Sequence, residues 1–298
     1  MRLAVFRDGG AAAYRLGVVS GDSVTDVTSP LGVAGGWPDG PLPRLLEHGG
    51  RLADVVNGAV GDAVRHGQPR RLADLRLAAP VPRPGKVIGA PVNYRDHQAE
   101  MESPTTLAEL GVFLKAPSSV IGPGDSVRLP YTDRRTDQEA ELAVVVGRTA
   151  RHVSAAEAPG VVAGYTCALD MTVRGGEDRS TRKSFDTFCP LGPWLVTPDE
   201  VGDPGALRLR CWVGDELRQD ARTADMIFDV PHLIAYASAV MTLHPGDVLV
   251  TGTPAGVGPV ADGDTVTVEI ERIGRLEVTV TAAGAVPYAS RPGPAETP

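Results

Sequence analysis

Residues 136–146 pass from acidic side chains directly into a block of apolar and β-branched ones. This pattern predicts a β-strand that enters a hydrophobic core. Because side chains alternate between the faces of a strand, Glu139 and Glu141 are expected on one face, with only Ala140 between them. Two carboxylates held that close repel each other unless a positive group lies between them. The stretch therefore predicts either the solvent-exposed face of a sheet or a site for a divalent cation.

A second apolar stretch favours the cation site. Residues 161–169 also predict a strand, and a single acid, Asp170, follows them. Asp170 at a strand end can join Glu139 and Glu141 in a site of three carboxylates that leaves positions for water or substrate. Carboxylate oxygens suit hard ions, so Mg²⁺ or Mn²⁺ is expected as the cofactor, with Ca²⁺ as a further candidate.

Through these carboxylates and other ordered motifs, the chain resembles the fumarylacetoacetate hydrolase family, in particular its acylpyruvate hydrolases and 2-hydroxyhepta-2,4-diene-1,7-dioate isomerases. The resemblance covers roughly residues 80–282, and so many motifs in the family's order make a chance match improbable. The other matching segments are 92–100 (VNYRDHQAE), 113–115 (FLK), 122–125 (GPGD), 183–187 (KSFDT), 191–194 (LGPW), 245–247 (PGD) and 251–258 (TGTPAGVG).

Short strands between Gly, Pro and Asp turns recur beyond residue 85, and helix signals are sparse there. This spacing favours a mixed β-sandwich or roll over a βαβ fold. The resemblance implies the same fold class: mainly β (α+β), the family's mixed β-sandwich roll with a small N-terminal α+β domain. We place the domain boundary in the proline-rich residues 79–85, because proline fixes φ and lacks an N–H donor. The predicted units are an N-terminal domain 1–78, a catalytic domain 79–285 and a disordered tail 286–298.

Hydrophobic periodicity and turn residues predict the individual elements. Strands are expected at 3–7, 14–20, 24–27, 207–213, 247–251 and 265–270, and helices at 41–67, 155–160 and 231–242. Turns are expected at 8–10 and 21–23, and a hairpin turn at 214–216.

His97 and Glu100 are three residues apart and share one face if the segment is helical. Glu100 can then orient His97 and raise its basicity, so that His97 deprotonates a water molecule. Without the resemblance, a polar surface loop would be the preferred interpretation of this pair. The resemblance carries the family's catalytic His and Glu to these positions. The acidic residues 102–111 are then a candidate lid over the substrate.

Two basic residues have a structural and a functional interpretation. Lys183 is either a surface lysine or a catalytic group that stabilises an enolate or oxyanion, and the family motif favours the second role. Arg174 either pairs with a nearby acid or binds a substrate carboxylate.

Three further positions are assigned to substrate binding. Residues 251–258 lack the spacing of a P-loop or a dinucleotide fingerprint, and predict a tight turn in which Gly252 and Thr253 line an anionic site. Glu177 stands where the family's fumarylacetoacetate and acylpyruvate hydrolases carry Gln. A carboxylate there would repel an acidic substrate tail, which argues against recognition of diacids.

The composition excludes several classes of partner. A net charge of −8 and a pI of about 5.3 leave no basic surface for nucleic acid. No apolar run is long enough to span a bilayer. Three cysteines without metal-ligand spacing, Cys167, Cys189 and Cys211, are typical of buried thiols in a cytoplasmic protein. The resemblance implies a homodimer.

These observations predict a Mg²⁺- or Mn²⁺-dependent hydrolase that cleaves a C–C bond in a β-diketo acid. A 2-oxo acid fits the metal site because its carboxylate and adjacent carbonyl can both bind the ion, and acylpyruvates are the class that the resemblance implies. The first alternative is a lyase or isomerase on the same scaffold, an oxaloacetate decarboxylase or a 2-hydroxydienoate isomerase. The second is a binding protein without catalysis.

Overall fold

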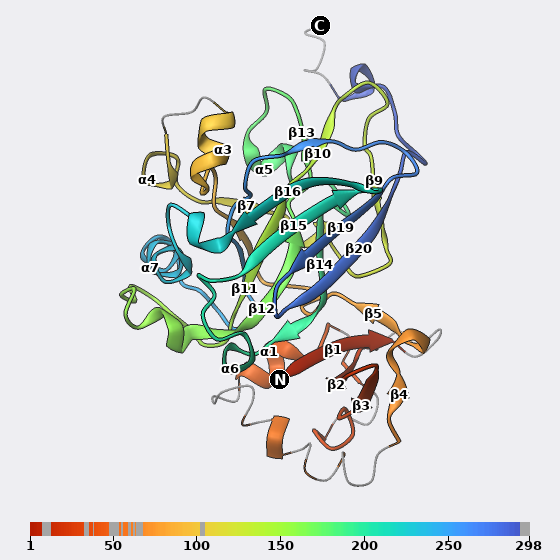
Figure 1. Ribbon diagram of the computed structural model, residues 1–298, viewed down its shortest axis with the longest axis vertical. Helices are drawn as coiled ribbons and strands as arrows, with labels where there is room; N and C mark the ends of the chain where they lie inside the picture. Colours follow the sequence, from red (N-terminus) through yellow and green to blue (C-terminus); the bar gives the residue numbers. More distant parts are fainter. Residues whose placement is uncertain are drawn as a thin grey trace, which may run out of the picture.

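The computed structural model describes residues 1–7, 13–32, 36–37, 39–47, 54, 56–58, 61, 63, 68–101 and 105–292 (Figure 1). Strands predominate, which confirms the predicted mainly β, α+β class. The strands are β1 (Arg2–Arg7), β2 (Arg15–Ser20), β3 (Ser23–Asp26), β4 (Arg70–Arg71), β5 (Arg76–Ala78), β6 (Val87–Gly89), β7 (Phe113–Lys115), β8 (Val120–Ile121), β9 (Ser126–Arg128), β10 (Thr136–Gln138), β11 (Ala140–Val146), β12 (Val162–Leu169), β13 (Thr172–Val173), β14 (Cys189–Val196), β15 (Arg208–Val213), β16 (Glu216–Arg222), β17 (Val248–Val250), β18 (Gly258–Pro259), β19 (Thr265–Ile270) and β20 (Gly274–Thr281). The described helices are α1 (Leu42–Glu47), α3 (Arg95–Glu100), α4 (Leu107–Leu110), α5 (Arg179–Arg182), α6 (Pro198–Val201) and α7 (Val230–Val240), with short 3₁₀ turns η1 (Leu72–Asp74), η2 (Pro117–Ser119), η3 (Ala158–Val161), η4 (Thr223–Asp225) and η5 (Tyr288–Ser290).

Two sheets pack face to face. The larger one runs in the order β4-β3-β2-β1-β14-β12-β11-β17-β6-β7, and the second in the order β16-β15-β19-β20-β9. Figure 1 shows β15, β16, β19 and β20 lying across β11, β12 and β14. One buried cluster joins Leu142 of β11, Leu209 of β15 and Val268 of β19, so the core lies between the two sheets. This is the predicted sandwich.

Strand β11 is buried on both faces, which explains the apolar run from Leu142 to Val146 that follows Glu141. Leu142 and Val144 belong to the cluster between the sheets. Ala143 and Val145 point to the opposite face, where they join a cluster that includes Leu3 and other N-terminal residues. The predicted strand over 136–146 is confirmed, with an interruption at Glu139 between β10 and β11.

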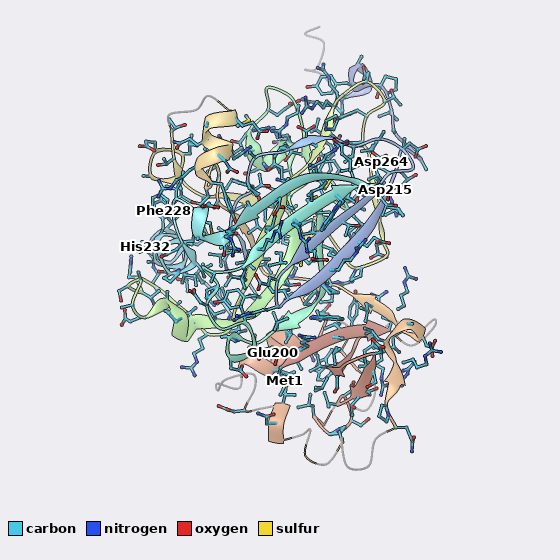
Figure 2. All side chains as sticks on the ribbon, in the orientation of Figure 1. Met1, Glu200, Asp215, Phe228, His232 and Asp264 are labelled. Atoms are coloured by element: carbon cyan, nitrogen blue, oxygen red, sulfur yellow. The ribbon has the colours of Figure 1, made fainter. Side chains whose placement is uncertain are left out.

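The N-terminal strands continue the larger sheet. Strand β1 pairs with β2 on one side and with β14 on the other, with Leu3 opposite Leu195. The amino group of Met1 donates hydrogen bonds to Thr197 Oγ1 at 2.6 Å and to Glu200 Oε2 at 3.1 Å, and Figure 2 shows Met1 beside Glu200. These contacts hold β1 against the end of β14.

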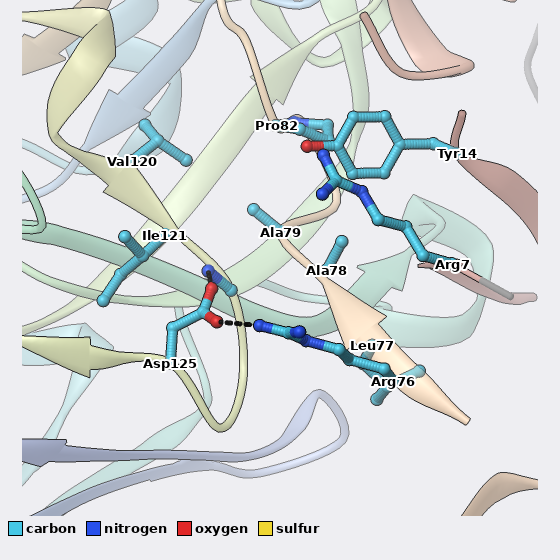
Figure 3. Close-up of a pocket in the computed structure, with 11 residues that line it drawn as sticks. Arg7, Tyr14, Arg76, Leu77, Ala78, Ala79, Pro82, Val120, Ile121 and Asp125 are labelled. Atoms are coloured by element: carbon cyan, nitrogen blue, oxygen red, sulfur yellow. Dashed lines mark hydrogen bonds and ion pairs between the residues drawn. The ribbon is translucent and has the colours of Figure 1, made fainter. Parts of the chain in front are cut away.

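A cavity lies where the N-terminal strands meet the turn at 122–125 (Figure 3). Its acidic lining residue, Asp125, pairs with Arg76 at 3.2 Å. Arg76 is largely exposed, so the pair contributes little to stability. Among the described residues that line this cavity, Asp125 is the one carboxylate, and the candidate chemistry lies elsewhere.

Most predicted elements are confirmed, and one is wrong. The helix expected at 155–160 is a turn followed by the 3₁₀ turn η3, because Pro159 has no N–H to extend an α-helix. Within the helix expected at 41–67, the structure describes α1, and most of the residues after α1 lie outside the described part. The turn expected at 8–10 also lies outside it. The hairpin at 214–216 is confirmed by the pairing of Val213 with Glu216.

The described residues before the C-terminus are held against the segment that contains Tyr131 and Asp133. Tyr288, in the segment assigned to a tail, packs edge-on against the ring of Tyr131 with centroids 5.1 Å apart. Residues 293–298 lie outside the described part. Among the described residues, no helix combines the length and apolar character required to cross a bilayer.

Candidate active site

Three carboxylates meet at the ends of paired strands. Glu139 lies between β10 and β11, Glu141 lies on β11, and Asp170 directly follows β12. Strands β11 and β12 are antiparallel, and the Asp170 N–H donates to the Glu139 carbonyl at 2.8 Å. One ligand atom from each of the three acids lies within 4.8 Å of the others, and all three residues are buried. The pairing therefore brings together the acids that the sequence places about thirty positions apart.

Two buried lysines surround these acids. Lys183 Nζ donates to Glu139 Oε2 at 2.7 Å, to Asp170 Oδ2 at 2.5 Å and to Thr172 Oγ1 at 2.8 Å. Lys115 Nζ pairs with Asp170 Oδ1 and donates to the Phe188 carbonyl at 3.0 Å. Lys183 is therefore a buried member of this cluster and not an exposed lysine.

The surroundings separate the pKa values of the two glutamates. Burial alone would raise the pKa of Glu139, but Lys183 and Arg174 outweigh burial and lower it to about 2. Burial and the charge of Asp170 raise the pKa of Glu141 well above its ordinary value. Burial opposes the charge of Lys183, but Asp170 and Glu139 raise its pKa. Glu141 is thus the acid whose charge the protein compensates least.

The site fits a divalent cation. Its donors are hard carboxylate oxygens, the type that Mg²⁺ and Mn²⁺ prefer. The Gly252 N–H donates to Glu141 Oε2 at 2.6 Å and orients that carboxylate. A cation would also supply the positive charge that Glu141 lacks. Glu139, Glu141 and Asp170 are the residues that would hold it.

This charge arrangement makes metal affinity depend on pH. Because the pKa of Glu141 is raised, a proton competes with the cation at that oxygen up to a higher pH than at an ordinary glutamate. We expect Mg²⁺ affinity, measured by titration calorimetry, to fall as the pH is lowered from about 8 to about 6. Titrations in two buffers of different ionisation enthalpy should show a proton released on binding; affinity independent of pH over this range would contradict the expectation.

His97 and Glu100 form the predicted pair on α3. His97 Nδ1 lies 2.9 Å from Glu100 Oε2, and Glu100 Oε1 accepts a hydrogen bond from the Gly256 N–H at 3.1 Å. Only 8% of the His97 side chain is exposed, against 36% for Glu100. An ionised Glu100 assigns the proton to Nδ1 and leaves Nε2 as the acceptor. The pair is therefore not a polar surface loop.

One cavity contains nearly all of these groups. It brings His97 together with the three acids, Lys183 and the turn at Thr253. The lining residues are Ala90, Pro91, Val92, His97, Met101, Phe113, Glu139, Glu141, Asp170, Arg174, Arg179, Arg182, Lys183 and Thr253.

The turn residues have well-defined partners. Thr253 Oγ1 donates to the Ala140 carbonyl at 2.9 Å and accepts from Gln219 Nε2 at 2.7 Å. Gly252 has φ of +90°, and a Cβ there would lie 2.7 Å from the Asn93 Cβ. Glycine is therefore required at this position, and its N–H is directed to Glu141 rather than to a phosphate.

Arg174 pairs with acids of the protein itself. Its Nε donates to Asp137 Oδ2 at 2.6 Å and its Nη2 to Glu139 Oε1 at 2.9 Å. Burial opposes the charge of Arg174, but Glu139 and Asp137 outweigh it and raise its pKa. Of the two interpretations of Arg174, these contacts show the pairing with nearby acids.

Glu177 does not line this cavity. It lines a neighbouring one, where its carboxylate accepts hydrogen bonds from the Tyr288 hydroxyl and from Arg291. Those partners lower its pKa. Its charge is therefore directed away from the carboxylate site, and the expected repulsion of an acidic substrate has no support in this geometry.

The family model described as fumarylacetoacetate (FAA) hydrolase C-terminal matches residues 86–281. The chain belongs to the fumarylacetoacetate hydrolase family. This confirms the family indicated by the sequence motifs.

Relatives of named activity match almost the whole chain. Maleylpyruvate hydrolase of Aquipseudomonas alcaligenes is 46% identical over 280 residues, covering 89% of this chain and 96% of that protein. The structure of maleylpyruvate hydrolase from Sphingobium sp. SYK-6, in complex with manganese(II) and pyruvate, has a TM-score of 0.82 at 44% identity and covers 94% of this chain and 99% of that one. The structure of 2-hydroxyhepta-2,4-diene-1,7-dioate isomerase from Mycobacterium marinum has a TM-score of 0.71 at 33% identity. The match covers 94% of this chain and 98% of that one.

Sequence reasoning missed three basic residues of the site. Lys115 lies in the family segment 113–115 and has no role predicted from the sequence, yet it pairs with Asp170. Arg179 and Arg182 line the cavity from α5. The density of basic residues in 179–183 was the signal available for them.

The predicted lid is described only in part. Residues 102–104 lie outside the described residues, and α4 follows. Thr106 begins α4 with a capping box, in which the Thr106 N–H and hydroxyl both donate to Glu109 Oε2 at 2.7 Å.

Proposed function

We propose that the protein is a divalent-metal-dependent hydrolase that cleaves the C–C bond of an acylpyruvate-type β-diketo acid. The observation that carries this proposal is a single cavity lined by three buried carboxylates and by His97, whose Nδ1 is hydrogen-bonded to Glu100. The manganese(II) and pyruvate in the 44% identical Sphingobium structure support a 2-oxo acid at such a site. We propose Mg²⁺ or Mn²⁺ as the ion.

In the proposed reaction, His97 and Glu100 transfer the proton and Lys183 stabilises negative charge. Glu100 holds the Nδ1 proton of His97, so that Nε2 can accept a proton from a water molecule. The water oxygen bonds to the distal carbonyl carbon, the C–C bond to the pyruvyl carbon breaks, and the electron pair passes into the pyruvate enolate. The proton held by His97 is then available to the enolate carbon, which yields pyruvate and a free acid. Lys183 places a positive charge beside the acids where the enolate oxygen would lie. A bound divalent ion would add Lewis-acid polarisation of the 2-oxo group.

A product assay tests this proposal. The Mg²⁺-loaded protein is incubated with a short acylpyruvate and, separately, with oxaloacetate. We expect pyruvate and the matching free acid in equal amounts from the acylpyruvate. Pyruvate and CO₂ from oxaloacetate, with no cleavage of the acylpyruvate, would contradict hydrolysis and indicate a decarboxylase.

Isomerisation is the second candidate, because the Mycobacterium marinum isomerase shares the fold at 33% identity. A double-bond shift needs an ion and an enolate stabiliser but no activated water. The pairing of the buried His97 with Glu100 favours hydrolysis, since it can activate a water molecule and isomerisation does not require one.

We also propose a homodimer and a cytoplasmic location. Both were expected from the sequence and the family resemblance. Sedimentation of the purified protein and fractionation of the producing cells would test them.

A further inference from the structure

A buried glutamine from the second sheet contacts the strand that carries two of the acids. Gln219 lies on β16, is fully buried, and uses both ends of its side-chain amide. Its Oε1 accepts a hydrogen bond from the Ala140 N–H at 3.0 Å. Its Nε2 donates to Thr253 Oγ1 at 2.7 Å and to the Pro254 carbonyl at 2.9 Å. Gln219 therefore joins β11 to the turn at Thr253.

These bonds close a ring around one residue of the chain. The Thr253 hydroxyl, which accepts from Gln219, donates to the Ala140 carbonyl at 2.9 Å. The N–H and the carbonyl of Ala140 are thus both held, one by Gln219 and the other by Thr253. Ala140 is the single residue between Glu139 and Glu141. The ring therefore fixes the backbone from which both carboxylates project.

The turn at 251–258 also reaches the second acid and the proton-transfer pair. The Gly252 N–H donates to Glu141 Oε2 at 2.6 Å, and the Gly256 N–H donates to Glu100 Oε1 at 3.1 Å. A shift of this turn would displace hydrogen-bond donors of both carboxylates together. The position of the turn therefore relates the acid cluster to the group that holds the histidine proton.

The turn lies directly on β16 beside Gln219. Gly256 has φ of +94°, and a Cβ there would lie 1.9 Å from the Arg218 carbonyl oxygen. Glycine permits this close approach of two backbones. Because β16 belongs to the packed second sheet, the Gln219 amide ties the turn to a fixed part of the fold.

We propose that Gln219 is a positioning residue for the site. It holds Ala140 and Thr253 in one fixed relation, and thereby sets where the metal-binding acids lie relative to the His97–Glu100 pair. Residues that orient ligands without touching the ion typically change metal affinity or activity by about 10- to 100-fold when they are replaced. The effect on rate rests on the proposed function, whereas the effect on the acids does not.

Mn²⁺ binding tests this role apart from catalysis. Q219M keeps the length of the side chain and removes its hydrogen-bonding groups. We expect it to weaken Mn²⁺ binding by about 10- to 100-fold in titration calorimetry. It should also change the zero-field splitting in the electron paramagnetic resonance spectrum of bound Mn²⁺, which depends on ligand geometry. At saturating Mn²⁺, kcat for an acylpyruvate should fall about tenfold or more while KM stays within about threefold, because misplacement of reacting groups acts on the transition state.

A double-mutant cycle with T253V tests the ring itself. T253V removes the hydroxyl that links the amide to the Ala140 carbonyl. T253S keeps that hydroxyl and should retain Mn²⁺ affinity within about threefold of wild type. Because Gln219 and Thr253 act through one ring, the loss of affinity in Q219M/T253V should be close to the larger of the two single losses. Fully additive losses would refute the ring.

The control variant is T223V, which removes the hydroxyl of another buried residue close to the end of β16. Thr223 Oγ1 accepts from the Leu207 N–H at 2.9 Å and donates to the Leu207 carbonyl at 3.3 Å. T223V and Q219M should both lower the unfolding temperature of the metal-free protein, but T223V should leave Mn²⁺ affinity and the spectrum unchanged. If Q219M also changed the unfolding temperature alone, its role would be merely structural and the proposal would be overturned.

Hydrolysis is measured separately, so that the two proposals fail separately. If wild type cleaves an acylpyruvate but Q219M keeps the wild-type Mn²⁺ affinity, spectrum and kcat, the proposed reaction stands and the positioning role fails. If wild type cleaves no acylpyruvate but Q219M weakens Mn²⁺ binding and alters the spectrum, the positioning of the acids stands and the proposed reaction fails.

Discussion

Replacing Glu141 by Gln is expected to abolish metal-dependent activity while leaving the metal-free protein at least as stable as wild type. Gln keeps an oxygen that can accept the Gly252 N–H, but it removes the negative charge that a divalent ion requires. Loss of groups that merely support a ligand typically costs 10- to 100-fold in affinity or activity, so we expect loss of a ligand charge to cost at least about 100-fold in kcat/KM. The measurements are steady-state hydrolysis and Mn²⁺ titration.

The stability of E141Q follows from the sign of the pKa shift. Burial and Asp170 raise the folded-state pKa of Glu141 above its unfolded value, so the folded protein binds this proton more tightly than the unfolded chain. The metal-free wild type therefore loses stability as pH rises above the unfolded pKa of about 4.3 and until it passes the folded pKa. Gln has no such loss. Metal-free E141Q should unfold at a higher temperature than metal-free wild type at about pH 8, and the difference should shrink toward about pH 5.

A matched control and a contrary outcome make this test specific. E216Q removes a glutamate that is 68% exposed and pairs with Arg218 on the surface, and it should change neither activity nor metal binding. Mn²⁺ should raise the unfolding temperature of wild type and of E216Q, but not that of E141Q. An E141Q protein that still gains stability from Mn²⁺ and turns over normally would refute Glu141 as a ligand.

The sequence predicted the parts of the site that local patterns determine. Alternation on a strand and an acid at a strand end identified Glu139, Glu141 and Asp170, because neighbouring antiparallel strands bring such positions together. Helical spacing placed His97 and Glu100 on one face. These features depend on residues close in sequence or on a single strand pairing.

The rest depended on contacts between distant segments. Lys115 reaches Asp170 across 55 positions, and no local pattern separates it from an ordinary lysine. Glu177 was assigned to the substrate because of its place after Arg174, but Tyr288 and Arg291 hold it in another cavity. Such contacts depend on which distant segments the tertiary fold brings together. Hydrophobic periodicity carries no information about those long-range contacts.

Replacing His97 by Ala is expected to reduce acylpyruvate hydrolysis by about 10²- to 10⁴-fold, the usual contribution of a general base. The metal ligands do not include His97 in the proposed mechanism, so Mn²⁺ binding and the affinity for oxalate, a flat mimic of the enolate, should stay within about threefold of wild type. E100Q should lower the rate in the same direction but by less, because it leaves the imidazole in place while removing the charge that fixes its Nδ1 proton.

The chain contains its own control for this experiment. His232 and Asp229 are also three residues apart at the start of a helix, with His232 Nδ1 2.6 Å from Asp229 Oδ1, but 63% of the His232 side chain is exposed. Figure 2 shows His232 near Phe228 at the N-terminal end of α7. His232 is not among the described residues that line the cavity of the three carboxylates. H232A should keep full activity. If H97A also kept the wild-type rate of acylpyruvate hydrolysis, water activation by the His97–Glu100 pair would be refuted, and another group of the site would have to activate the water.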